Sequence, residues 1–184
     1  MNKLSSELIA GLRVIQLAVY EDNRGFFVEK FNKKNFAELG LPTDYYQDNF
    51  SYSLPGVIRG LHYQQNPPQA KLVGCTRGRI WDVVVDIRKN SPSFGRHFAI
   101  ELSGENGKLL YIPLGFAHGF CVLGNEPADV VYKVDNRYSK EGEGGIVYDD
   151  GDLDIKWPIA NPILSAKDLN LPSFKEYRNS NRTF

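Results

Sequence analysis

Short segments rich in Val, Ile, Phe and Tyr recur along the chain, with polar or glycine-containing stretches between them. Their length and spacing are typical of β-strands. Stretches such as Arg77-Gly78 and Gly104-Glu105-Asn106-Gly107 supply the turn signals. The pattern predicts strands over Leu12–Val19, Phe26–Phe31, Val57–Tyr63, Lys71–Thr76, Ile80–Ile87, His97–Leu102, Leu109–Ile112, Gly119–Leu123 and Asp129–Val134.

Helical signals are few. Asn32 is suited to cap a short helix over Lys33–Leu39, which Gly40 would end. Ser165 is suited to cap a second helix through Lys167–Leu169. We expect both helices to lie outside the main β-structure.

Many short strands at this spacing predict an all-β fold, either a sandwich or a barrel of the jelly-roll kind. The 184 residues fit one domain, residues 1–184, with a sizeable core. No repeat or linker interrupts the pattern, and a loose polar tail is expected at Arg178–Arg182.

Composition narrows the function classes. Lys plus Arg and Asp plus Glu number 22 each, so the formal net charge is zero. A nucleic-acid partner is therefore not expected, because such binding usually requires a basic excess. Any positive potential for an anionic ligand must come from a few convergent side chains.

Cys75 and Cys121 both lie in apolar β-like runs, where buried free thiols are favoured over a disulfide. The first residues make a poor secretory signal, and no stretch approaches the roughly 20 apolar residues of a membrane helix. A cytoplasmic protein without a membrane partner is expected.

The segment Val57–Asn66 carries the strongest candidate chemistry. His62 is a candidate base, and Arg59 supplies a planar cation suited to phosphate. In a straight strand these two residues face opposite sides. Both can line one pocket only if Gly60 breaks the alternation or Arg59 reaches around the rim.

His118 follows Pro113 and Gly115 in an order similar to the second cupin motif, in which that histidine binds a metal. Metal-dependent cupins also need an earlier His-x-His and a glutamate. This chain has no His-x-His, and His97 stands alone in a strand. We expect the cupin architecture without a metal.

Lys71 opens an otherwise apolar run, as a strand-edge lysine or as a cation near a carbonyl oxygen. Tyr132 alternates with valines, so its hydroxyl acts as an acid only if it faces a ligand. Asp168, if it meets His62, would fix the histidine tautomer.

Other polar residues fit either turns or ligand contacts. Arg24 lies in a turn, and an arginine in a loop is also a natural phosphate contact. Gln47, Asp48 and Asn49 stand between aromatic residues and suit either a turn or the edge of a nucleobase.

Several longer motifs resemble one family. They are Gly56–Gln64 (GVIRGLHYQ), Asp82–Arg88 (DVVVDIR), Ser91–Gly95 (SPSFG) and Ile112–Phe120 (IPLGFAHGF), and the match continues to Leu164–Asp168. On these motifs the chain resembles the dTDP-4-dehydrorhamnose 3,5-epimerases nearly end to end.

The resemblance implies a homodimeric cupin-type jelly roll with short peripheral helices, no metal and no cofactor, acting on dTDP-4-dehydro-6-deoxy-D-glucose. It implies that His62 is the base, Asp168 its partner, Tyr132 the proton donor, and Lys71 a polar group at the sugar. By the same resemblance, the substrate is contacted by Arg24, Glu29, Gln47, Asn49, Arg59, His118, Tyr138, Glu143 and Lys167.

The chain also departs from the family pattern. Gly74-Cys75 stands where the family often has Arg-Val, Tyr148-Asp149-Asp150-Gly151 replaces Trp-Asn-Asp-Pro, and Val134-Asp135 replaces Cys-Thr. None of these changes removes a catalytic group. They leave the exact sugar nucleotide open.

The expected reaction is proton removal by His62 at carbons 3 and 5, beside the 4-ketone, with Lys71 and His118 near the enolate and Tyr132 returning a proton. The alternatives are a single-centre epimerase or a ketoisomerase on a related sugar, a metal cupin oxygenase, and a non-catalytic sugar-binding module.

Overall fold

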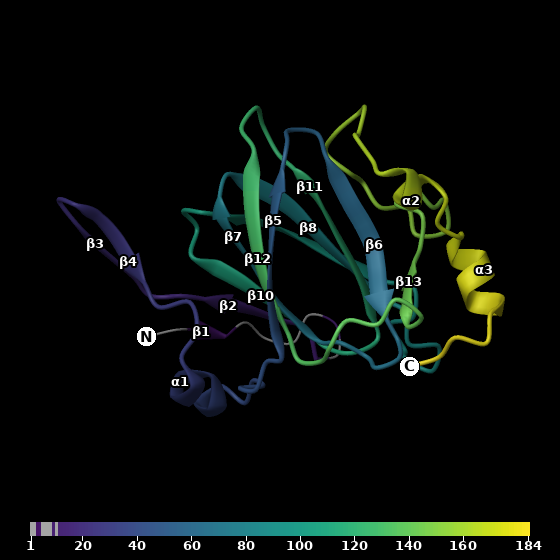
Figure 1. The fold of residues 1–184 in the computed structure, drawn as a ribbon, viewed down its shortest axis with the longest axis horizontal. Helices are drawn as coiled ribbons and strands as arrows, with labels where there is room; N and C mark the ends of the chain where they lie inside the picture. Colours follow the sequence, from purple (N-terminus) through teal and green to yellow (C-terminus); the bar gives the residue numbers. More distant parts are fainter. Residues whose placement is uncertain (1–2, 5–8, 10) are drawn as a thin grey trace.

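The computed structural model describes residues 3–4, 9 and 11–184. In this part of the chain two antiparallel sheets lie face to face and form a barrel (Figure 1). Along the first sheet the order is β1 (Lys3–Leu4), β2 (Arg13–Gln16), β10 (Lys108–Ile112), β7 (Lys71–Arg77), β12 (Ala128–Val134) and β5 (Gln47–Ser53). Along the second it is β13 (Glu143–Gly145), β6 (Ile58–Gln64), β11 (Phe116–Val122), β8 (Arg79–Asp86) and β9 (His97–Ser103).

A separate hairpin and three short helices complete the described chain: β3 (Val19–Asp22), β4 (Gly25–Val28), α1 (Lys33–Glu38), α2 (Ala166–Leu169) and α3 (Phe174–Asn179). The predicted all-β jelly roll with short peripheral helices is confirmed. None of the described helices has the length and apolar character needed to cross a membrane.

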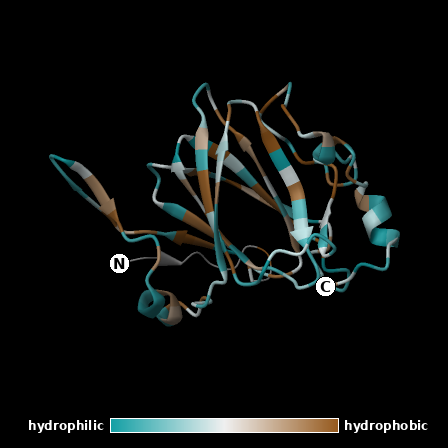
Figure 2. Cartoon of the chain, viewed as in Figure 1, coloured by the Kyte–Doolittle hydropathy of each residue, from teal (hydrophilic) through white to brown (hydrophobic). Residues whose placement is uncertain are grey.

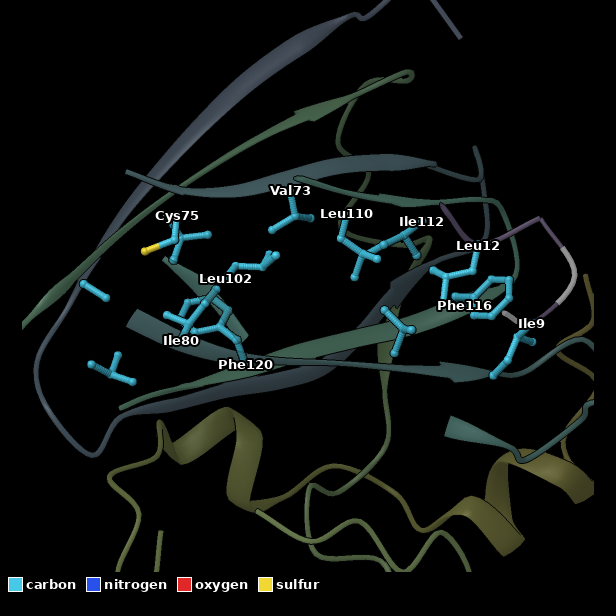
Figure 3. Packing of buried hydrophobic residues seen from close by; sticks show 14 residues of the cluster. Ile9, Leu12, Val73, Cys75, Ile80, Leu102, Leu110, Ile112, Phe116 and Phe120 are labelled. Atoms are coloured by element: carbon cyan, nitrogen blue, oxygen red, sulfur yellow. The ribbon is translucent and has the colours of Figure 1, made fainter. Parts of the chain in front are cut away.

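The largest hydrophobic core fills the space between the two sheets, as Figure 3 shows. Val73 and Leu110 come from the six-stranded sheet, and Ile80 and Phe120 from the five-stranded sheet. In Figure 2 hydrophobic residues are concentrated along the strands and hydrophilic residues in the connecting turns. This core fixes the separation of the two sheets.

The five-stranded sheet is covered on its outer face as well. Val83 and Val85 of β8 pack in a second core with Phe174 and Tyr177 of α3. The Tyr177 hydroxyl donates a hydrogen bond to the Ile87 carbonyl oxygen at 2.6 Å. Because both faces of this sheet are buried, β8 is a nearly continuous apolar run.

Helix α1 covers part of the outer face of the six-stranded sheet, where Phe36 packs with Ile15 and Leu109. The Asn32 side chain accepts hydrogen bonds from the first backbone N–H groups of the helix, which confirms the predicted cap. The helix ends one residue earlier than predicted, at Glu38.

Three predicted strands differ from the structure by more than one residue, and one of them, Gly119–Leu123, begins three residues too late because β11 spans Phe116–Val122. Leu12–Val19 is divided between β2 and the first residue of β3, and Phe26–Phe31 is reduced to the residues of β4. Strands β1, β5 and β13 were not predicted. The prediction of a loose tail at Arg178–Arg182 is wrong, because that stretch begins inside α3 and ends with Arg182 bonded to the Tyr63 hydroxyl.

The hairpin of β3 and β4 stands away from the barrel, at the far left of Figure 1. It exposes three aromatic side chains, Tyr20, Phe26 and Phe27. At the edge of the six-stranded sheet, β5 pairs with β12 alone among the described strands. The fold thus presents a hairpin with three exposed aromatic side chains and an unpaired strand edge.

Candidate active site

Arg59 and His62 reach the same cavity because the alternation of β6 is interrupted between them. Phe120 of β11 pairs with Arg59 and His118 pairs with His62, so three steps on β6 oppose two on β11. Gly60 lies at this irregularity with a φ of 124°, and a Cβ there would lie 2.6 Å from the backbone of β11. Glycine is required at such a position. Gly60 therefore breaks the alternation, as one of the two predicted solutions required.

His62 is paired with a buried carboxylate. Its Nε2 lies 2.6 Å from Oδ1 of Asp168, in helix α2, whose N-cap is Ser165 as predicted. Burial raises the pKa of Asp168, but hydrogen bonds from His62, the Gly60 backbone and Ser165 outweigh it and hold the pKa below its ordinary value. The carboxylate assigns the proton to Nε2 and leaves Nδ1 with a lone pair.

Lys71 of β7 and Tyr132 of β12 line this cavity from the opposite, six-stranded sheet. Burial lowers the pKa of Lys71 to about 8, although the carboxylates of Asp82 and Glu143 favour its charged form. Burial also raises the pKa of Tyr132, so that its hydroxyl keeps its proton at neutral pH. A cation and a proton donor therefore face the histidine.

A second histidine–carboxylate pair lies beside the first. His118 of β11 is paired in register with His62 of β6, and its Nε2 lies 2.9 Å from Oδ2 of Asp82 on β8. Both residues of this second pair are buried. No role for Asp82 was predicted from the sequence, although a buried aspartate within an apolar strand is unusual unless it is paired.

His62, Asp168, Lys71, Tyr132 and His118 line one cavity of about 490 Å³, whereas Asp82 lies behind His118 and does not line it. The polar part of the lining consists mainly of the two histidines on one sheet and of Lys71 and Tyr132 on the other. The remainder is largely apolar and is the part that sequence reasoning missed: Val57, Ile58, Gly119, Phe120, Ile163 and Leu164. Such a mixture suits a ligand with an apolar part and a reactive polar centre.

A smaller recess of about 130 Å³ adjoins the cavity and shares His62, Lys71 and Tyr132 with it. Gln47 and Asn49 of β5 line the recess, and the Gln47 amide donates to the Asn49 side-chain oxygen at 2.6 Å. Two neighbouring spaces thus meet at the candidate catalytic groups.

The rim of the site is a charged cluster. Glu143 Oε1 lies 2.6 Å from the Lys167 Nζ, and Glu143 Oε2 accepts a hydrogen bond of 3.0 Å from the Tyr138 hydroxyl. Burial raises the pKa of Glu143, but these two partners outweigh it and lower the pKa. Arg59 donates to the Ser53 hydroxyl of β5 at 2.9 Å and so joins the two sheets.

Two predicted contacts lie apart from this site in the single chain. Arg24 is at the tip of the hairpin, where its guanidinium pairs with Asp22 at 2.6 Å and its side chain is 85% exposed. Glu29 accepts hydrogen bonds from Asn32 and Asn35 at the start of α1. Neither residue lines the cavity or the recess.

The departures from the family pattern also lie away from the cavity. Gly74 is on the outer face of its strand, where a Cβ would meet the Leu109 side chain at 2.4 Å. Asp150 accepts hydrogen bonds from the backbone of Leu153 and Phe174, and Asp135 accepts one from Ala70. These residues have structural contacts that do not involve the cavity.

Cys75 and Cys121 are free and buried, as predicted. Among the described residues, no group of three or more His, Cys, Asp or Glu side chains is arranged to hold a metal ion.

Comparison with known proteins gives one consistent result. The family described as dTDP-4-dehydrorhamnose 3,5-epimerase matches residues 6–176. A relative of that name from Shigella flexneri is 50% identical over 176 residues, which are 95% of this chain and 96% of the relative.

Two solved structures agree with this result. The epimerase of that name from Elizabethkingia anophelis NUHP1 is 50% identical, with a TM-score of 0.88 over 95% of this chain and 97% of the other. A 3,5-epimerase from Legionella pneumophila Philadelphia 1, in complex with dTDP-4-keto-L-rhamnose, is 44% identical, with a TM-score of 0.90 over 94% and 93%. The cupin-type jelly roll is thereby confirmed, and the chain belongs to the dTDP-4-dehydrorhamnose 3,5-epimerase family.

Proposed function

We propose that this protein epimerises carbons 3 and 5 of dTDP-4-dehydro-6-deoxy-D-glucose and so forms dTDP-4-dehydro-L-rhamnose. One observation carries the proposal: the His62–Asp168 pair, joined at 2.6 Å, lines a cavity that Lys71 and Tyr132 line from the opposite sheet. Membership of the family supplies the substrate.

The chemistry follows from the position of the ketone. Carbons 3 and 5 flank the carbonyl at carbon 4, so removal of either proton leaves a negative charge that spreads onto the carbonyl oxygen. His62, held in one tautomer by Asp168, takes the proton on Nδ1. The Lys71 ammonium stabilises the oxyanion. Because the substrate's own ketone accepts the charge, the proposed reaction uses no cofactor and no metal.

Inversion requires that the proton return to the opposite face of the sugar. His62 belongs to the five-stranded sheet and Tyr132 to the six-stranded sheet, so the two groups approach the cavity from different walls. Tyr132, with its raised pKa, is suited to donate the returning proton. The base and the acid are thus separate residues in this proposal.

Substrate binding is assigned to the rim and the recess. Arg59 and Lys167 supply positive charge for the diphosphate, and His118 lies beside the sugar. Tyr138 presents an exposed ring for contact with the nucleoside, while Gln47, Asn49 and Glu143 supply polar groups in the recess. These assignments are proposals for the residues that the cavity brings together.

The test is incubation with the dTDP-4-keto sugar in deuterium oxide, with NMR used to read both the label and the configuration. We expect deuterium at carbons 3 and 5 and inversion at both. Label and inversion at one carbon would instead identify a single-centre epimerase. Movement of the ketone to a neighbouring carbon would identify a ketoisomerase, and absence of exchange would leave a binding module.

Tyr132→Phe should separate exchange from inversion. The variant retains His62 and Lys71, so a proton can still leave and return on the same face, whereas delivery to the opposite face loses its donor. We expect inversion to fall about 10²-fold or more, with a smaller loss of deuterium exchange. The two rates are measured in one NMR time course.

Tyr46→Phe is the matched control, because Tyr46 is exposed and lies outside both cavities. It should behave as the wild type. Equal losses of exchange and inversion in Tyr132→Phe would contradict the assignment of Tyr132 as the returning acid.

We also propose that the protein is a homodimer and that the hairpin of one protomer completes the site of the other. The exposed aromatic residues of the hairpin and the unpaired edge of β5 support an intermolecular contact. Gln47 and Asn49 of the site lie on β5 itself. A hairpin added beside β5 would bring Arg24 near a bound diphosphate.

Mixed dimers should test this arrangement. We expect Arg24→Ala to raise KM and His62→Ala to remove turnover. If Arg24 acts in the partner's site, co-expression of the two variants gives dimers with one complete site and, at substrate concentrations well below the raised KM, about a quarter of wild-type activity overall. Activity no greater than that of the two parent variants combined would show that Arg24 acts within its own chain or not at all.

A further inference from the structure

The Asp82–His118 pair is the buried ionisable pair that the proposed mechanism leaves without a role. Asp82 is fully buried on β8, between core residues Ile80 and Val84. One of its oxygens accepts the hydrogen bond from His118. A carboxylate in such surroundings is costly unless its charge is compensated.

The second carboxylate oxygen of Asp82 is not neutralised by a hydrogen bond from the described part of the chain. Oδ1 is buried and has no hydrogen-bond partner among the described protein groups. The charge of Asp82 acts to raise the pKa of Lys71, which lines the same cavity as His118. One aspartate thus acts on two groups that line the cavity.

We propose that Asp82 is a positioning residue for the epimerisation: it orients the His118 ring and holds Lys71 in its ammonium form beside the substrate ketone. This inference rests on the proposed function. With Nε2–H donated to Asp82, His118 presents Nδ1 to the ligand. With the aspartate charge nearby, the charged form of this half-buried lysine is favoured.

Glu143 also favours the charged form of Lys71, but its own charge is shared with Lys167. The titratable and charged groups that line the cavity or the recess with Lys71 are Arg59, His62, Tyr63, His118, Tyr132, Tyr138, Glu143, Lys167 and Asp168. Of the two other carboxylates, Asp168 is paired with His62 and Glu143 with Lys167. In Asp82, Oδ2 accepts a hydrogen bond from His118, and Oδ1 has no hydrogen-bond partner among the described residues.

The decisive experiment is the pH profile of kcat/KM for Asp82→Asn, which removes the charge and keeps the shape. Loss of the carboxylate should move the alkaline limb about one pH unit lower, because the ammonium form of Lys71 loses its support. At alkaline pH the kcat/KM of Asp82→Asn should be up to about tenfold lower than that of the wild type, and near pH 6 the two values should differ much less.

Asp82→Glu is the conservative counterpart, since it disturbs packing but restores a carboxylate. Its alkaline limb should return toward the wild-type position, even if its melting temperature is lower. Asp86→Asn, in an equally buried residue of β8 bonded to Arg88, should lower stability without moving the limb. Asp82→Ser gives a second uncharged variant if Asp82→Asn does not fold.

Two outcomes would overturn the inference: a folded Asp82→Asn or Asp82→Ser variant whose alkaline limb matches the wild type, or a limb displaced equally in the Asn and Glu variants. Failure of the wild type to exchange deuterium into the keto sugar would instead refute the proposed function.

Discussion

His62→Ala should abolish deuterium exchange at carbons 3 and 5 and lower turnover by about 10³-fold or more. General base catalysis contributes about 10²–10⁴-fold, and the other groups in the cavity are poorly suited to replace it. Lys71 is needed as a cation, and Tyr132 keeps its proton at neutral pH. Asp168 would remain as a buried carboxylate without its histidine partner.

Exchange is read by NMR and folding by thermal unfolding, so that loss of chemistry is separated from loss of structure. The chain offers a matched control in His97→Ala, because His97 is exposed on β9 and lies outside the cavity. That variant should retain full activity. Wild-type exchange in a folded His62→Ala protein would remove His62 from the mechanism.

Lys71→Met should lower kcat by about 10²–10³-fold, the usual effect of losing one preorganised group at an oxyanion. Methionine preserves the unbranched shape and removes the charge, so substrate binding should change less than turnover. In the wild type, the lowered pKa of about 8 means that the ammonium form is lost as pH rises through that value. Wild-type activity should therefore decline above about pH 8.

The measurement is steady-state kinetics between pH 6 and pH 9.5, with Lys156→Met as the control, because that lysine is largely exposed and pairs with Asp154. The control should retain both the rate and the alkaline decline. A Lys71→Met enzyme within about threefold of wild-type kcat would contradict oxyanion stabilisation by this residue.

The pattern of apolar segments predicted most strands because the sheets bury regular faces. Strand β5 was not predicted, because its inward-facing residues are polar and its exposed residues include aromatic ones. Its inward positions carry Gln47, Asn49 and Ser51, whereas Phe50 and Tyr52 are exposed. A strand that lines a ligand cavity departs from the usual apolar-in arrangement, so the departure was itself a sign of the site.

Helix α3 was missed because it is only six residues long, although Ser173 and Glu176 form a capping box that was readable in the sequence. Individual site residues could be predicted only where they belong to a recognisable sequence motif. Contacts between distant segments, such as those of Asp168 with His62 and Asp82 with His118, depend on strand register and loop paths. Local spacing contains no information about either.

The two walls of the site have a consequence for its sensitivity to temperature. Because the groups that remove and return the proton belong to opposing sheets, the gap between them depends on how tightly Val73, Ile80 and Phe120 pack. Modest swelling of that interior would lengthen the proton's route while every strand stayed paired. On heating, this protein should therefore lose its activity at a lower temperature than that at which it unfolds.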